Sequence, residues 1–151
     1  MTPAARLTRQ GLVHIWVAQL IQSLVLCGAV LMFLQMSGPL ASVDAGPEWK
    51  RYAMYAILLA AVPAMLYLRT FKALLDADLA AERKRGVPDP ELRQRLSRSL
   101  KIGGLLCDLP MAFGALQLFF GGETRWFVGA TMVTIAIRLS YRPFDKGARK
   151  A

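Results

Sequence analysis

The chain has 151 residues, of which 55% are hydrophobic, and its formal net charge is +9. Charged residues are nearly absent from four windows and dense between them. A soluble helical bundle would instead spread charge along one face of every helix, so this distribution argues against a soluble domain. We expect one domain over residues 1–151, folded as an all-α integral membrane protein.

The four apolar windows predict four transmembrane helices. A helical span needs about 17 to 25 apolar residues. The first window has 26 residues without a formal charge, which is longer than the apolar core of a cleaved signal peptide at about 7 to 15 residues. We therefore expect it to remain as a span. The fourth window is the weakest because Arg138 interrupts it. The predicted spans cover about 11–36, 52–68, 102–120 and 124–141.

The basic residues predict the orientation of these spans. Sixteen of the nineteen Lys and Arg residues fall on the side that holds both termini and segment 69–101. Cytoplasmic loops carry the excess of Lys and Arg, so we expect both termini in the cytoplasm, with the chain in the cytoplasmic (inner) membrane of a bacterium. This topology and attraction to anionic lipid explain the positive charge. Membrane lipid is thus an expected partner, and nucleic acid is not.

The first window carries polar residues on one side. At about 100° per residue, Gln19, Gln22 and Ser23 fall within one sector of the helix. Such a polar intramembrane face predicts hydrogen bonds between helices or, alternatively, a transport or ligand role. His14 is the only histidine in the chain. A haem held by two histidines of this chain is therefore excluded, and the one cofactor role left to His14 is an axial ligand shared with a partner.

Segment 69–101 predicts a basic helical hairpin. Its pattern is helical up to Arg85, and Asp89 followed by Pro90 is typical of the N-cap and first residue of a second helix. We expect the hairpin to face anionic lipid, to dock a protein partner or to be solvated. Its basic residues are Arg83, Lys84, Arg85, Arg93, Arg95, Arg98 and Lys101.

Two charged residues lie inside the third and fourth windows. An ionisable group near the bilayer centre costs about 2.5 to 3.5 kcal/mol on insertion scales. Asp108 lies about 9 Å of helical rise from the inner end of its span, and Arg138 about 4.5 Å. Side chains lean toward the N-terminus of their helix, which points the two groups toward each other. We hypothesise a buried Asp108–Arg138 ion pair, which either lets the two spans insert together or acts as a proton-linked or substrate-binding pathway.

No catalytic or metal-binding motif is present. The sequence lacks the HExxH, GxSxG, P-loop and dinucleotide-binding patterns, and the segments between the windows hold no cluster of histidine or cysteine. Cys27 and Cys107 differ in depth by about 16 Å, which excludes a disulfide between them. We expect no catalytic residue, no metal and no cofactor.

The function that these features favour is non-enzymatic. We expect a subunit or an accessory or assembly component of a membrane complex, packing against a protein partner or another copy of itself through small-residue helix faces and the basic hairpin. The alternative is a small oligomeric transporter, linked to protons or ions, that uses Asp108 and Arg138. An enzyme or electron-transfer anchor that uses His14 ranks third.

Overall fold

The computed structural model describes residues 9–37, 47–87 and 89–143. These residues form helices and turns and contain no strand, so the all-helical prediction is confirmed. Residues 38–46 and both chain termini lie outside the described residues. The helices are α1 (Arg9–Ser37), α2 (Pro47–Arg85), α3 (Pro90–Cys107), α4 (Leu109–Phe119) and α5 (Thr124–Ser140).

Three helical stretches are long and apolar enough to cross a membrane: Arg9–Ser37, Arg51–Arg85 and Pro90–Phe119. The third combines α3 and α4. Helix α5 has 17 residues, which give it a length of about 25 Å at 1.5 Å per residue. The lengths and hydropathy of the three stretches indicate a membrane protein.

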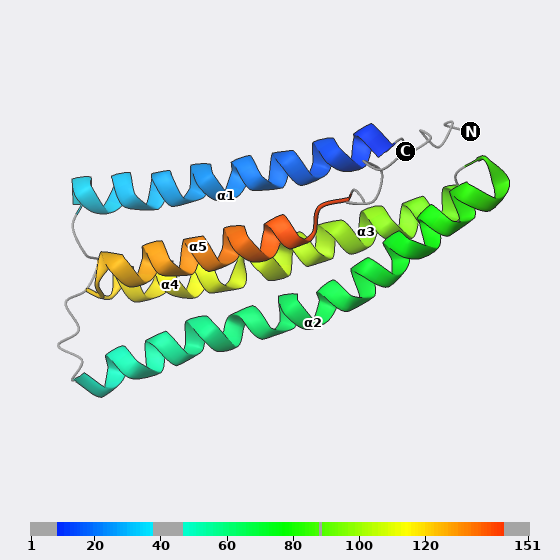
Figure 1. Ribbon diagram of the computed structural model, residues 1–151. Coiled ribbons are helices and arrows are strands. Elements are labelled where there is room, and N and C mark those ends of the chain that lie inside the picture. The colour runs from blue at the N-terminus through cyan, green and yellow to red at the C-terminus, as the bar shows by residue number, and fades with distance from the viewer. Residues whose placement is uncertain (1–8, 38–46, 88, 144–151) are drawn as a thin grey trace.

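The helices form three layers, which Figure 1 shows from the side. Helices α4 and α5 pack against each other in the middle, and α3 continues this layer. Helix α2 covers one side of it along α3 and α4, while α1 lies on the other side and has no close contact with α2 within the described residues. The start of α1 and the end of α5 point toward the same end of the molecule as the turn between α2 and α3. The middle layer is therefore the part of the fold that meets every other helix.

The predicted third span is interrupted at Asp108, where α3 ends and α4 begins. Pro110 explains the interruption, because proline has no N–H to donate and its ring collides with the carbonyl four residues earlier. The Asp108 N–H donates to the carbonyl of Leu105 at 3.2 Å, three residues back. A regular α-helix would direct this N–H to the carbonyl of Gly104. The carbonyl of Gly104 thus loses its usual donor inside the bundle.

A turn that contains Gly86 and Asp89 joins α2 to α3. Helix α2 ends at Arg85, and Gly86 follows with a positive φ of 67°. Asp89 is the N-cap of α3, and its side chain accepts a hydrogen bond from the N–H of Glu91 at 3.0 Å. The predicted N-cap is thereby confirmed.

Helix α2 continues through Pro63 as a single helix and is bent along its length in Figure 1. Ala60 and Ala64, one turn apart on this helix, are buried. Ala64 belongs to the main core with Leu100 and Cys107 of α3. Small side chains therefore lie where α2 approaches the middle layer.

The contact between α4 and α5 depends on Gly114. A Cβ atom at this position would lie 2.8 Å from the Cβ of Ala130 and 3.3 Å from the Cα of Phe127. We expect Gly114→Ala to lower the free energy of unfolding in detergent by about 1 to 3 kcal/mol through overpacking. Gly129→Ala is the matched control, because Gly129 of α5 has no atom within 4 Å of such a Cβ. It should leave stability unchanged or raise it, and an equal rise in Gly114→Ala would contradict the close approach.

Candidate functional site

A buried polar network surrounds Arg138 near the end of α5. The side chain of Arg138 is only 2% exposed. It extends from the inner face of α5, where Thr134 and Ala130 are also buried one and two turns earlier. The guanidinium meets polar groups of α1 and of the α3–α4 junction. Arg138 is thus the residue through which three helices share hydrogen bonds.

The structure brings Arg138 and Asp108 into contact. Arg138 Nη2 lies 2.9 Å from Asp108 Oδ2, and the carboxylate is 27% exposed. The other carboxylate oxygen, Oδ1, accepts a hydrogen bond from the hydroxyl of Ser23 at 3.1 Å. Ser23 is fully buried on α1 and also accepts a hydrogen bond from Arg138 Nη1. The Ser23 hydroxyl, on a third helix, therefore bonds to both members of the ion pair.

Two backbone carbonyls complete the network. Arg138 Nη2 donates to the carbonyl of Gly104 at 2.8 Å, and Nη1 donates to the carbonyl of Gln19. The Gly104 carbonyl is the one that the break at Asp108 deprives of its usual donor. A buried carbonyl without a donor is costly, so the arginine compensates for the backbone break as well as for the carboxylate.

Hydrogen bonds to α1 and α2 also hold the C-terminal end of α5 in place. The indole N–H of Trp16 on α1 donates to the carbonyl of Arg138 at 2.9 Å. The hydroxyl of Tyr141 donates to the carbonyl of Ala64 on α2, and its ring lies 5.2 Å from that of Phe71, measured between centroids. These contacts connect the residues around Arg138 to both outer layers.

The three residues of the predicted polar face of α1 do not all point into the bundle in the structure. Ser23 and the carbonyl of Gln19 enter the network, and the Gln19 amide lies where a Cβ on Gly104 would collide with it. Gln22 is exposed instead, which corrects the expectation that all three residues share one inward face. Gln22 precedes Ser23 by one residue, and a rotation of about 100° carries its side chain around to the outside.

His14 takes no part in this network, because it lies on the exposed side of α1. Its role as a haem ligand stays a prediction. Within the described ranges, no group of three or more His, Cys, Asp or Glu residues is placed to hold a metal ion. Cys27 and Cys107 are both free thiols, as their depths predict.

A second buried charge cluster joins α2 to α3. Arg93, expected among the lipid- or partner-facing basic residues, is only 8% exposed. Its Nε lies 3.5 Å from Asp78 Oδ2 and its Nη2 lies 3.1 Å from Glu82 Oε2. The expectation was wrong for this residue because α3 packs its Arg93 face onto α2. The other predicted basic residues are exposed: Arg83, Lys84, Arg85, Arg95, Arg98 and Lys101.

Several residues of these clusters were not predicted from the sequence. Asp78 and Glu82 had a readable signal, because two acids four residues apart share one helix face within a basic segment. Pro110 likewise indicates a free carbonyl near Asp108. No sequence pattern indicates that Trp16 would bind the carbonyl of Arg138, or Tyr141 that of Ala64, because these contacts depend on how whole helices are placed.

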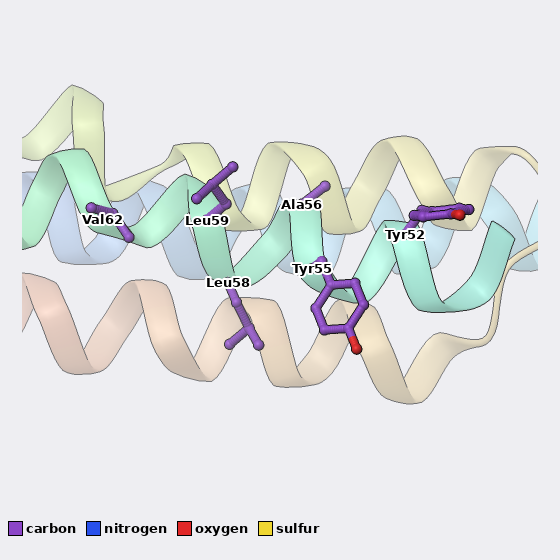
Figure 2. Close-up of a pocket in the computed structure, with 6 residues that line it drawn as sticks. All are labelled: Tyr52, Tyr55, Ala56, Leu58, Leu59 and Val62. Atoms are coloured by element: carbon purple, nitrogen blue, oxygen red, sulfur yellow. The ribbon is translucent and has the colours of Figure 1, made fainter. Parts of the chain in front are cut away.

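The outer face of α2 has a different chemistry. Figure 2 shows a shallow depression whose lining comes from one helix only, with apolar side chains and two tyrosines. Its residues are Tyr52, Tyr55, Ala56, Leu58, Leu59 and Val62. An open apolar surface of this kind suits lipid chains better than a polar ligand.

Comparisons with protein-family models, with curated proteins and with solved structures find no match to this chain. The Arg138 network and the outer surfaces of the helices are therefore the features that indicate a function.

Proposed function

We propose that the chain is a small four-span protein of the bacterial cytoplasmic membrane that serves as a non-enzymatic subunit or assembly component of a membrane complex. The observation that carries this proposal is that groups of the same chain hold both members of the Asp108–Arg138 pair. The carboxylate is bonded through both oxygens, and the guanidinium donates to one carboxylate, one hydroxyl and two carbonyls. A pair held in this way ties helices together and leaves the outer faces for partners.

The proposed topology has both termini in the cytoplasm and residues 69–101 as a cytoplasmic hairpin. Its supports are the side of the basic residues and the common direction of the start of α1, the α2–α3 turn and the end of α5. Residues 124–141 serve as the fourth span. The ion pair supports this assignment, because neutralising Arg138 offsets the cost of inserting a charge into a span near the minimum length.

The exposed basic residues of the hairpin support contact with anionic headgroups or with an acidic surface of the partner. Arg95, Arg98 and Lys101 lie on α3 outside the Arg93 cluster. Lys and Arg next to a span contribute about 1 kcal/mol each toward an anionic leaflet.

A transporter is the second candidate, and two observations favour it. The Asp108 carboxylate keeps 27% exposure. Two buried atoms of the network, Arg138 Nε and Gln19 Oε1, lack hydrogen-bond partners among the described residues. A donor and an acceptor left open beside a partly exposed carboxylate are the features that a proton- or ion-linked pathway would use.

Two experiments distinguish the candidates. The first is purification of the tagged chain from its native membranes in mild detergent, followed by mass spectrometry. The second is a flux assay. We expect a partner at fixed stoichiometry and no proton or ion flux when the chain alone is reconstituted in vesicles. A chain that purifies without a partner and shows a flux abolished by Asp108→Asn would overturn the subunit proposal in favour of the transporter.

A further inference from the structure

The outer face of α1 carries a regular pattern that its packing in the bundle does not use. Six exposed residues follow one another at alternating spacings of four and three. This is the spacing of the a and d positions of a heptad repeat, which brings two helices together along one seam. The seam lies away from Leu12 and Ser23, the two residues that α1 buries. Its members are Ala18, Gln22, Val25, Ala29, Met32 and Met36.

Gln22 is the anomaly in this seam. It lies thirteen residues after the start of α1 at Arg9 and fifteen before its end at Ser37, which places it near the middle of the span. Its side chain is exposed and has no hydrogen-bond partner among the described residues. An unpaired amide in the hydrocarbon core is unfavourable, since neither water nor lipid chains can bond to it there.

We propose that α1 pairs with α1 of a second copy of this chain along this seam, with the two Gln22 amides hydrogen-bonded to each other. This proposal rests on the proposed function in that α1 must cross the membrane, and it specifies the surface for self-association.

A second copy fits because the amide is self-complementary. A glutamine amide offers two donors and one acceptor oxygen, so each of two facing amides satisfies the other. All copies insert in the same orientation, so two α1 helices lie parallel, and a two-fold axis then places a seam residue opposite itself. A single polar residue at a heptad position is known to fix register and the number of strands in this way.

The neighbours of Gln22 permit the approach that the hydrogen bond needs. Ala18 lies one turn before Gln22, and Ala29 lies two turns after it. Small side chains at such positions let membrane helices come close together. The depression on the outer face of α2 lacks a comparable central amide, since its lining is aliphatic and tyrosine side chains.

Fluorescence energy transfer tests the pairing, using donor- and acceptor-labelled full-length chains purified and reconstituted in vesicles at varied protein-to-lipid ratios. We expect Gln22→Leu to raise the dissociation constant of the pair about tenfold, because an interhelical amide bond in a membrane contributes roughly 1 to 2 kcal/mol. Gln22→Asn should retain most of the affinity. Gln35→Leu is the matched control, since Gln35 is exposed on α1 but lies off the seam.

Disulfide cross-linking locates the interface in a background that carries Cys27→Ala and Cys107→Ala. Ala18→Cys and Ala29→Cys should cross-link between copies, whereas Leu24→Cys, exposed on another side of α1, should not. Equal cross-linking at Leu24→Cys, or an unchanged dissociation constant in Gln22→Leu, would overturn the pairing and leave lipid or an unrelated helix as the occupant.

The two proposals fail in different ways. These assays use the purified chain alone, so loss of the pair while a native partner still copurifies overturns only the α1 pairing. A Gln22-dependent pair in a chain that has no native partner and conducts ions overturns only the subunit role.

Discussion

Replacing Arg138 by glutamine is expected to lower the free energy of unfolding in detergent by about 3 to 5 kcal/mol, the usual loss when one partner of a buried ion pair is removed. The substitution leaves the Asp108 carboxylate without its cation and the carbonyl of Gly104 without a donor. The hydroxyl of Ser23 loses its donor as well. Unfolding in SDS or by heat, followed by circular dichroism, measures the change.

Companion variants separate the ion pair from the other bonds of the arginine. Asp108→Asn should also destabilise the fold, though by less, because the single amide oxygen of asparagine still accepts from one of the two donors, Ser23 or the guanidinium. The combined Asp108→Asn and Arg138→Gln variant should lose less than the sum of the two, since the residues are in direct contact. Arg142→Gln is the control, and its effect should stay within about 0.5 kcal/mol. If Asp108→Asn changes nothing while Arg138→Gln collapses the fold, the backbone carbonyls and not the pair explain the role of Arg138.

The Asp108–Arg138 contact shows which features of a site are readable from a sequence. The rise per residue gives the depth of each charge in its span, and the lean of helical side chains gives its direction. Both properties are local, so the sequence alone predicts that these two side chains lie at comparable depths in their spans. The bonds to Ser23 and to the carbonyls of Gly104 and Gln19 depend on how α1 approaches the middle layer, which no local property determines.

The same limit explains where the expectations differed from the structure. Periodicity placed Gln19, Gln22 and Ser23 in one sector but did not give the rotation of α1 about its own axis, and this rotation exposes Gln22. Residue type alone placed Arg93 with the exposed bases, although α2 offers it two carboxylates. The interruption at Asp108 had a local cause in Pro110, so this part of the difference was readable in principle.

The buried Arg93 cluster gives the second large effect. Arg93→Met is expected to cost about 3 to 5 kcal/mol of unfolding free energy, because it leaves Asp78 buried without a cation. Asp78 is only 4% exposed, and its Oδ1 has no hydrogen-bond partner within the described residues. Arg95→Met, two residues further on the exposed side of α3, should change stability by no more than about 0.5 kcal/mol.

A compensating variant decides whether Arg93 stabilises the contact between α2 and α3 or only neutralises a charge. Asp78→Asn combined with Arg93→Met removes the charges of both members of the most buried pair, and we expect it to recover most of the loss, because no uncompensated charge is then left buried. Glu82 keeps 37% exposure, so water solvates its carboxylate once Arg93 is gone. Failure to recover, together with greater protease cleavage near the turn at Gly86, would mean that the ionic bonds themselves hold α3 against α2. Recovery would mean that the packing of buried neighbours such as Phe71 and Leu96 suffices to hold α3 against α2. Arg93 would then serve only to neutralise the charge of Asp78.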